Sequence, residues 1–198
     1  MITEPLISLP FRFDSIDHSY TALDTGELLP HITGMLARTG WINDRWYTVE
    51  SSERGTAIHS LTADYDLGAL DVATLISRYR GWVLAWVQLK AVLQATMLSV
   101  EEPLVHPILR FGGRPDRAVR VDGLKGPGEI KSGAPEKAHQ VQTALQAILL
   151  EPQLGIPAIH QRRLAFYIKD DGKMKVKPHD DPRDILEARR IVSVCCAA

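Results

Sequence analysis

The stretch G-G-R-P-D-R-A-V-R-V-D-G-L-K-G-P-G-E-I-K-S-G-A-P-E-K-A-H-Q-V-Q-T-A-L-Q, residues 112–146, decides the fold expected for this chain. Asp116 ends one apolar-rich segment, and thirteen residues later Glu129 and Lys131 stand on either side of Ile130. If both segments are strands, a hairpin brings the two carboxylates together. Residues two apart on a strand point to the same face, so Glu129 and Lys131 would project into one site while Ile130 faces the core.

This arrangement suits hydrolysis of a phosphate ester. Two carboxylates on adjacent strands can hold a hard divalent cation such as Mg²⁺, and the backbone carbonyl of Ile130 would add a third oxygen ligand. A metal acidifies a bound water and neutralises charge on a phosphate, and the Lys131 ammonium would orient that water or stabilise the transition state. A lone E-x-K sequence is more often a surface pair in a hairpin, so the surrounding sequence has to decide.

The surroundings resemble the PD-(D/E)XK nuclease superfamily, in its branch of RecB-like and phage-type exonucleases. Asp116 after a proline, followed by Glu129 and Lys131, matches the family signature, with Glu where many relatives carry Asp. The segment after the lysine is similar to the family's helix with a Q-x-x-x-Y motif. Gln142 matches the Gln of this motif, and Gln146 stands where the Tyr would be.

Two upstream segments extend the resemblance. R-G-T-A-I-H, from Arg54 to His59, is similar to a helical G-T-x-x-H motif whose His ligates metal. V-E-E-P-L-V-H resembles a strand whose Glu, here Glu101, assists the site in some members. The resemblance spans residues 11–151 as four motifs in the family's order, which are jointly more specific than any of them alone.

The resemblance implies one nuclease-like domain over residues 1–198, with an α/β fold in which helices flank a central mixed β-sheet as in restriction endonucleases. It implies a Mg²⁺- or Mn²⁺-dependent DNA nuclease, expected to be an exonuclease of phage or bacterial DNA recombination or repair. DNA is the expected partner, and a homo-oligomer or a recombination partner protein would be compatible with it. The implied roles are metal binding by His59, Glu101, Asp116, Glu129 and the Ile130 carbonyl, catalysis by Asp116, Glu129, Lys131 and Gln142, and substrate binding by Arg54, Arg114 and Gln146.

Two other functions remain open at this point. A catalytically silent protein of the same fold would bind DNA or a partner, and Gln146 in place of Tyr favours it. An enzyme acting on a small phosphorylated molecule would need a phosphate-binding loop. Gly123 and Gly128 have the spacing of such a loop, but Glu129 follows them instead of Lys.

Composition limits the location and the partners. The chain has 198 residues, a net charge of −1 and 45% hydrophobic residues, so any DNA contact must come from a local basic patch. Cys195 and Cys196 provide neither a disulfide framework nor the four thiolates of an iron–sulfur cluster, and they are expected in a frayed tail. No segment has the length and apolarity of a membrane span, so a cytosolic protein of a bacterium or a phage-infected cell is expected.

Patterning also predicts the elements around the site. They are strands over 7–29 with a turn at Asp17-His18, a short helix over 31–40, a helix capped near Ser51 and Ser52, two helices within 71–96 broken near Arg80-Gly81, an edge strand over 97–105, a turn over 123–128 that shortens the next strand, a helix over 135–150 ended by Pro152 and Gly155, a hairpin over 163–178 around Asp171-Gly172, and a helix over 181–194. His59 lies beside the apolar stripe of its helix, so two roles remain open for it, that of a metal ligand and that of a half-buried core residue. Lys169, Lys173, Lys175 and Lys177 would give the late hairpin a basic face, for solubility or for a phosphate track.

Overall fold

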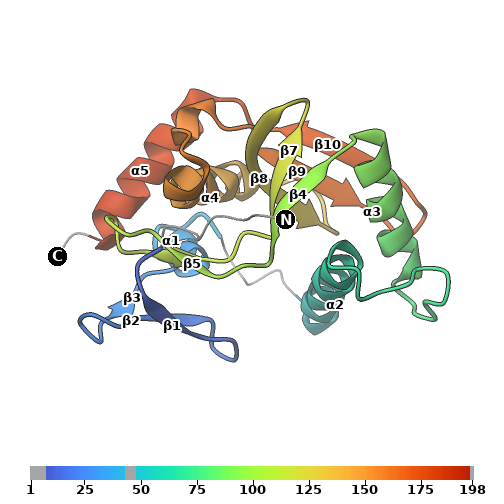
Figure 1. The fold of residues 1–198 in the computed structure, drawn as a ribbon, viewed down its shortest axis with the longest axis horizontal. Coiled ribbons are helices and arrows are strands. Elements are labelled where there is room, and N and C mark those ends of the chain that lie inside the picture. Colours follow the sequence, from blue (N-terminus) through green and yellow to red (C-terminus); the bar gives the residue numbers. More distant parts are fainter. Residues whose placement is uncertain (1–7, 43–47, 197–198) are drawn as a thin grey trace.

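A five-stranded mixed sheet with the order β10-β9-β8-β7-β4 forms the centre of the molecule (Figure 1). The computed structural model describes residues 8–42 and 48–196. Helices flank the sheet, which confirms the predicted α/β fold with a central mixed sheet. Among the described helices, none combines the length and the apolarity that a membrane crossing needs.

The predicted hairpin lies in the middle of this sheet. β7 (Arg117–Val121) and β8 (Leu124–Lys131) are antiparallel, and Arg117 pairs with Gly128. The connecting Asp122 and Gly123 both have positive φ, 52° and 78°, which is typical of the tight two-residue turns that join twisted strands. Because of this register, Asp116 comes to lie beside Glu129.

Of the turn predicted over residues 123–128, only Gly123 lies in a turn, because residues 124–128 belong to β8. Glycine is needed at positions 126 and 128 of this strand, because a Cβ there would run into the backbone of Arg162 and the ring of Phe166, respectively. Parallel pairing with β9 (Leu164–Ile168) begins only at Gly128, so Pro127 has to pair with one neighbouring strand alone. Close packing therefore accounts for residues that look like strand breakers.

The two edges of the sheet were predicted with different success. β10 (Met174–Pro178) pairs antiparallel with β9 across the predicted turn, where Gly172 has a φ of 80°. At the other edge, β4 (Thr96–Val100) pairs with β7 and carries a bulge between Met97 and Ser99. The predicted strand over 97–105 is thus divided, because β5 (Leu104–Val105) pairs with β6 (Gly112–Gly113) in a separate small sheet.

Helices cover the sheet in two groups, each with its own core (Figure 1). α4 (Ala138–Leu154) and α5 (Pro182–Cys196) share one core with α1 (Ile32–Arg38) and Ala118 of β7. α2 (Val49–Asp66) and α3 (Arg80–Val92) pack with Val119, Ile130 and Phe166 in the second core. Because side chains alternate along β7, Ala118 faces the first core and its neighbour Val119 faces the second.

Several predicted helix boundaries are corrected. Residues 71–79 form turns instead of a helix, so a single helix begins where the break was predicted. The cap of α2 is Thr48, whose side chain accepts a hydrogen bond from the backbone N–H of Ser51, and not Ser51 or Ser52. Pro152 lies within α4, which ends at the left-handed Gly155.

The C-terminal cysteines are not in a frayed tail. α5 begins at Pro182 as predicted but continues to Cys196, and the Cys195 side chain is buried against the core of α1 and α4. The helix is amphipathic to its end, so the same apolar stripe that starts it also orders its last turn.

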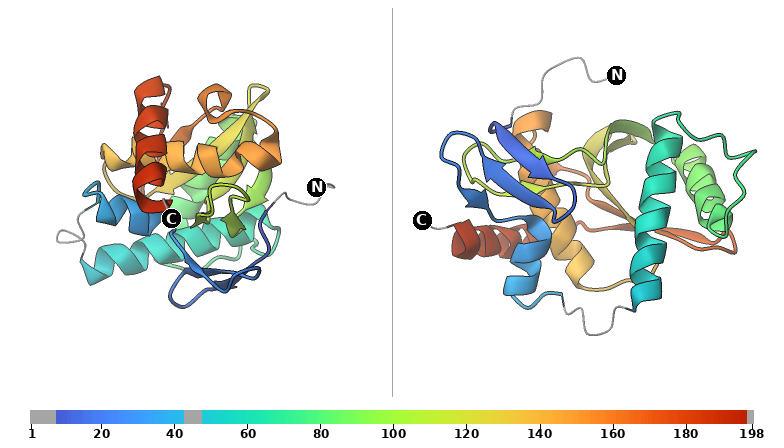
Figure 2. Two further views of the ribbon diagram at one scale, coloured as in Figure 1. Left: turned by 90° about the vertical axis from the view of Figure 1, so that its left-hand side faces the viewer. Right: turned by 90° about the horizontal axis from the view of Figure 1, so that it is seen from below.

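The N-terminal residues form a small antiparallel sheet of β1 (Phe11–Asp14), β2 (Ser19–Ala22) and β3 (Leu28–Leu29). His18, with a φ of 57°, makes the predicted turn between β1 and β2. The short 3-10 helix η2 (Ala158–His160) follows α4. Viewed from below, α2 stands apart from the small sheet and has α3 on its far side (Figure 2, right).

Candidate active site

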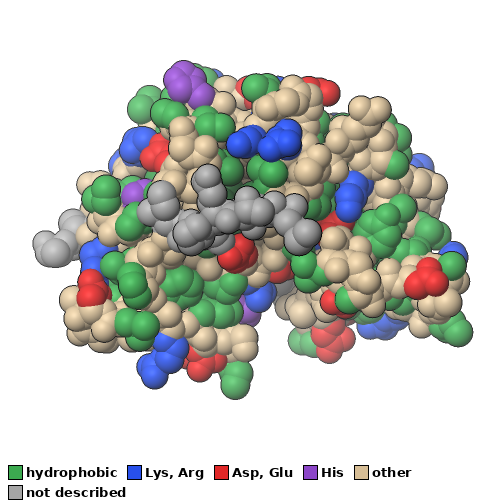
Figure 3. Space-filling view, viewed as in Figure 1, with side chains coloured by type: hydrophobic (Ala, Val, Ile, Leu, Met, Phe, Trp, Pro, Cys, Tyr) green, Lys and Arg blue, Asp and Glu red, His purple; other side chains and the backbone are tan. Residues whose placement is uncertain are grey.

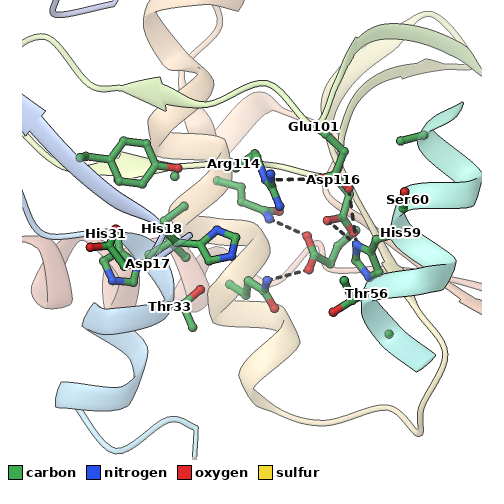
Figure 4. A pocket seen from close by; sticks show the side chains of 18 of the residues that line it. Asp17, His18, His31, Thr33, Thr56, His59, Ser60, Glu101, Arg114 and Asp116 are labelled. Carbon is green, nitrogen blue, oxygen red and sulfur yellow. Dashed lines mark hydrogen bonds and ion pairs between the residues drawn. The ribbon is translucent and has the colours of Figure 1, made fainter. Parts of the chain in front are cut away.

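A cavity of about 730 Å³ opens between α2, the β1–β2 turn and the ends of the central strands. Its acidic wall carries His59 from α2, Glu101 after β4, Asp116 before β7, Glu129 from β8, and Gln142 and Gln146 from α4. The opposite wall carries Asp17, His18, His31 and Thr33 (Figure 4). The hairpin register and the placement of α2 thus bring together residues from five separate parts of the chain.

His59, Glu101 and Asp116, called the triad below, form a group of potential metal ligands. Their ligand atoms all lie within 4.8 Å of one another. His59 Nδ1 is 3.0 Å from Asp116 Oδ1 and 3.5 Å from Glu101 Oε1. The other oxygen of Asp116 accepts a hydrogen bond from the backbone N–H of Ile130 at 2.7 Å, which fixes the carboxylate against β8.

Glu101 reaches the site through an unusual backbone conformation. Its φ is 48°, in the left-handed region that non-glycine residues rarely adopt, and such positions often have a functional reason. Its N–H donates to the Asp116 carbonyl at 3.0 Å, and its Oε2 accepts from Arg114 Nε at 3.2 Å. Its buried Oε1 makes no hydrogen bond to any described residue, so one lone pair remains available inside the triad.

Three donors hold the carboxylate of Glu129. Its Oε1 accepts from Lys131 Nζ at 2.8 Å and from Gln142 Nε2 at 2.6 Å, and its Oε2 accepts from Gln146 Nε2 at 2.6 Å. Gln142 also accepts from Lys131 at 3.0 Å through its Oε1. The i, i+4 spacing on α4 therefore directs both amides to one carboxylate.

Burial and neighbouring charges change the pKa values in opposite directions. Burial disfavours the imidazolium of His59, but the carboxylates of Asp116 and Glu101 outweigh it and raise the His59 pKa to about 10. Burial also acts against ionisation of Asp116, yet the His59 charge holds the pKa of Asp116 below its usual value. Burial and then repulsion from Asp116 raise the pKa of Glu129.

The triad fits a divalent cation. It offers two carboxylate oxygens and an imidazole nitrogen, a donor set suited to Mn²⁺ and to metals that accept nitrogen, and less characteristic of Mg²⁺. Two observations indicate that this site favours positive charge. The buried Oε1 of Glu101 makes no hydrogen bond to any described residue, and two carboxylates surround one protonated imidazole. Glu129 lies outside this group because its oxygens face the amides and Lys131.

The other predicted site residues have different positions. Arg114 lines the cavity beside Glu101, with its guanidinium 5.9 Å from the centre of the Phe13 ring. Arg54 lies on α2 but is not among the described residues that line the cavity. Ile130 has its side chain in the core, as the alternation on β8 required.

The basic face predicted for the late hairpin lies on the β9–β10 connection and on β10, at the sheet edge opposite β4. None of its four lysines is among the described residues that line the cavity. Lys173 pairs with Asp171 next to it. On the face in Figure 3, lysine and arginine side chains stand in small separate groups among acidic and apolar ones.

Three residues near the site were missed by the sequence reasoning. His18 was assigned only to a turn, but it also lines the cavity. Asp66 and Arg117 form a fully buried ion pair behind the triad, with 2.7 Å between Asp66 Oδ2 and Arg117 Nε. No local pattern could have identified this pair, because its members are 51 residues apart in the sequence.

Comparisons with known proteins add little to this description. No family model matches the chain, and no curated protein matches it. Among solved structures, the chain is similar to the crystal structure of LHK-Exo in complex with dAMP, with a TM-score of 0.45 and 17% sequence identity over 85% of this chain and 86% of that chain. A likeness at this level carries no conclusion about function, so the chemistry has to be judged from the residues of the cavity.

Proposed function

We propose that this protein is a metal-dependent nuclease that hydrolyses phosphodiester bonds in DNA, as the resemblance of its motifs to PD-(D/E)XK nucleases implies. One observation carries the proposal: a single cavity is lined by a triad that suits a divalent cation and by Glu129, whose carboxylate is paired with the ammonium of Lys131. Hydrolysis of a phosphate ester needs both parts, one to bind a cation and one to stabilise developing negative charge.

The triad would hold Mg²⁺ or Mn²⁺, and the resemblance adds Glu129 and the Ile130 carbonyl as further ligands. A metal bound there supplies acidification of a water and neutralisation of phosphate charge. Asp116 is kept in place by the N–H of Ile130, and its low pKa keeps it ionised near neutral pH.

Lys131 is the proposed electrostatic catalyst. Its ammonium is held between Glu129 Oε1 and Gln142 Oε1, so it has a defined orientation next to two residues that line the cavity, although Lys131 is not itself among the described lining residues. There it would orient the attacking water and stabilise charge on the pentacoordinate phosphate. Gln142 positions this pair, and Arg114, which lines the cavity with a 36% exposed side chain, is the proposed contact to the substrate backbone.

At a finer level we propose an exonuclease of phage or bacterial DNA recombination or repair, because the motifs resemble that branch. The direct test is incubation with end-labelled linear DNA and with circular DNA, in Mg²⁺, in Mn²⁺ and in EDTA. Metal-dependent release of nucleotides from linear DNA alone is expected. Cleavage of the circular substrate would show an endonuclease, and cleavage in EDTA would contradict the metal-dependent site.

A variant pair makes this test specific to the site. Asp116→Asn removes a ligand charge with little change of volume, and we expect it to abolish cleavage. The protein should stay folded, because the lost ion pair with His59 is offset in part by relief of the repulsion with Glu129 and an amide oxygen can still accept from the N–H of Ile130. Asp180→Asn makes the same chemical change at a 60% exposed side chain paired with Arg162, and it should cleave like wild type. Equal activity of Asp116→Asn and wild type would refute the assignment.

A catalytically silent binding protein of the same fold is the second candidate. It is favoured by the three donors on Glu129, which a metal would have to replace in part, and by Gln146 at the position of the family's Tyr. Calorimetric titration with Mg²⁺ and Mn²⁺ separates the two candidates. A nuclease must bind at least one of these ions, whereas absence of binding by the intact protein would favour the silent protein.

A further inference from the structure

The side chain of Arg117 is fully buried behind the triad, a rare position for an arginine. Its Nε donates to Asp66 Oδ2 at 2.7 Å, its Nη1 to the backbone carbonyl of Asp116 at 2.6 Å, and its Nη2 to Thr62 Oγ1 at 3.2 Å. Nη1 also lies 3.6 Å from Glu101 Oε1. Each nitrogen of the guanidinium thus has a partner, and the partners come from three separate segments.

These partners are the segments that carry the triad. Thr62 and Asp66 lie on α2, three and seven residues after His59, so they follow it along the same helix. The Asp116 carbonyl accepts from Arg117 and also from the N–H of Glu101 at 3.0 Å. A single guanidinium therefore links the helix of one ligand to the backbone of the other two.

We propose that Arg117 is a positioning residue for the metal site: its guanidinium holds α2 against the ends of β4 and β7 so that the three ligand atoms of the triad converge. This inference rests on the metal-dependent function proposed above. It assigns no contact between Arg117 and the metal or the substrate.

The charge of Arg117 cannot explain its place, because a cation close to a metal site weakens metal binding. Asp66 offsets this charge at 2.7 Å. Asp66 is itself held by Trp86 Nε1 at 3.0 Å and by Lys90 Nζ at 2.6 Å, so α3 anchors the whole group. The remaining role of Arg117 is geometric. The three nitrogens of its planar fork are held apart in fixed directions, so they reach acceptors that the donors of one compact lysine ammonium cannot reach together.

Metal affinity measured apart from stability tests the proposal. Arg117→Lys keeps the charge and loses the fork. We expect this variant to bind Mn²⁺ about 10- to 100-fold more weakly, the usual loss when a partner of metal ligands is removed. Thr62→Val removes the Nη2 partner together with the hydrogen bond that Thr62 Oγ1 donates to the His59 carbonyl at 3.0 Å, and it should show a smaller loss in the same direction. Binding is measured by calorimetry and by the electron paramagnetic resonance of Mn²⁺, and melting temperature is measured in EDTA.

Lys90→Met is the matched control. It removes the other cation on Asp66, at Oδ1, and leaves the guanidinium contacts in place. It should lower the melting temperature while Mn²⁺ affinity and the resonance spectrum stay those of wild type. A purely structural role for Arg117 predicts the opposite pattern, in which affinity follows melting temperature equally in all variants.

The outcomes separate this inference from the proposed function. Wild-type Mn²⁺ affinity in folded Arg117→Lys, or an equal loss in Lys90→Met, would overturn the positioning role. If Arg117→Lys shows no cooperative melting, Thr62→Val decides by the same criterion. If the wild-type protein binds no Mn²⁺ while it melts cooperatively, the proposed function itself fails, and this inference fails with it.

Discussion

At the scale of single residues, His59 decides the charge of the site. Its imidazole lies between two carboxylates that raise its pKa to about 10, so it is protonated near neutral pH. A histidine must lose this extra proton before it can bind a metal ion. The same residue that completes the triad for a cation therefore competes with that cation as long as it is protonated.

Metal binding should consequently release a proton from His59. We expect about one proton to be released for each Mn²⁺ that binds near neutral pH. The affinity for Mn²⁺ should increase as the pH rises toward 10, because His59 then loses its proton even without metal. Calorimetry in buffers of different ionisation enthalpy measures the released protons.

His59→Ala is the control for this prediction. It should abolish the proton release and weaken Mn²⁺ binding with little change of melting temperature. A large fall of the melting temperature with unchanged metal affinity would show instead that His59 is a packing residue.

Lys131 permits a separate prediction, because its proposed role is electrostatic. Lys131→Ala should lower the turnover rate by roughly 10²–10³-fold, the scale for one preorganised electrostatic donor. Mn²⁺ affinity should not fall, since the removed ammonium repels a cation.

Single-turnover cleavage and a Mn²⁺ titration on the same variant test both parts. Lys131→Arg should not restore full activity, because a broad guanidinium replaces a compact charge. Loss of activity that is fully explained by loss of metal would rule out the catalytic role.

At the scale of elements, β8 positions the site through its glycines. Gly128 comes just before Glu129, and a Cβ there would lie 2.5 Å from Phe166 Cε2 and 3.1 Å from Val119 Cγ1. Phe166 also packs against Trp86, with 5.4 Å between the ring centres, so the ring has little freedom to move. Close approach of β8 to the second core is thus needed for Glu129 to face the cavity.

Gly128→Ala should therefore destabilise the protein by about 1–3 kcal/mol, the usual cost of overpacking a core. Gly133→Ala, a few residues later, is the control, because a Cβ at Gly133 meets no atom within 4 Å. Denaturant titration compares the two free energies of unfolding. Equal stability of both variants would mean that the sheet can move to accept the methyl group.

At the scale of the whole molecule, two neutral histidines connect α4 and the sheet. His139 Nδ1 lies 2.9 Å from the Tyr167 hydroxyl, and His179 Nδ1 lies 2.9 Å from Thr143 Oγ1. Burial is the main cause that lowers both pKa values, and nearby lysines and arginines add to it. The result is a pKa of about 3 for His139 and about 4 for His179.

Stability should fall in acid for this reason. A histidine with a lowered pKa is neutral in the folded state, while the unfolded chain takes up its proton below pH 6.5. The stabilisation from both residues is therefore fully present above pH 6.5. As the pH falls it is lost down to about pH 4 for His179 and about pH 3 for His139.

Melting temperatures across this pH range test the prediction. His139→Gln and His179→Gln should each reduce the slope of melting temperature against pH. An unchanged slope in both variants would assign the acid sensitivity to the carboxylates alone.

The sequence by itself determined the local features of this protein. Alternation and turn residues predicted the strands on both sides of Glu129, and helical spacing predicted that Gln142 and Gln146 share a face directed at the site. The predictions of a divided helix over 71–96 and of a shortened β8 were wrong, because Gly and Pro were interpreted without their spatial neighbours. Such patterns depend on residues a few positions apart, and these distances are set by backbone geometry.

Only the tertiary structure decided which residues meet. The left-handed backbone of Glu101 places its carboxylate against His59, and Arg117 pairs with Asp66 across 51 residues of sequence. Glu129 faces the amides of Gln142 and Gln146 and points away from the triad. These contacts form because two cores position α2 and α4 on opposite faces of one sheet, and side-chain packing between distant segments leaves no periodic signal in the sequence.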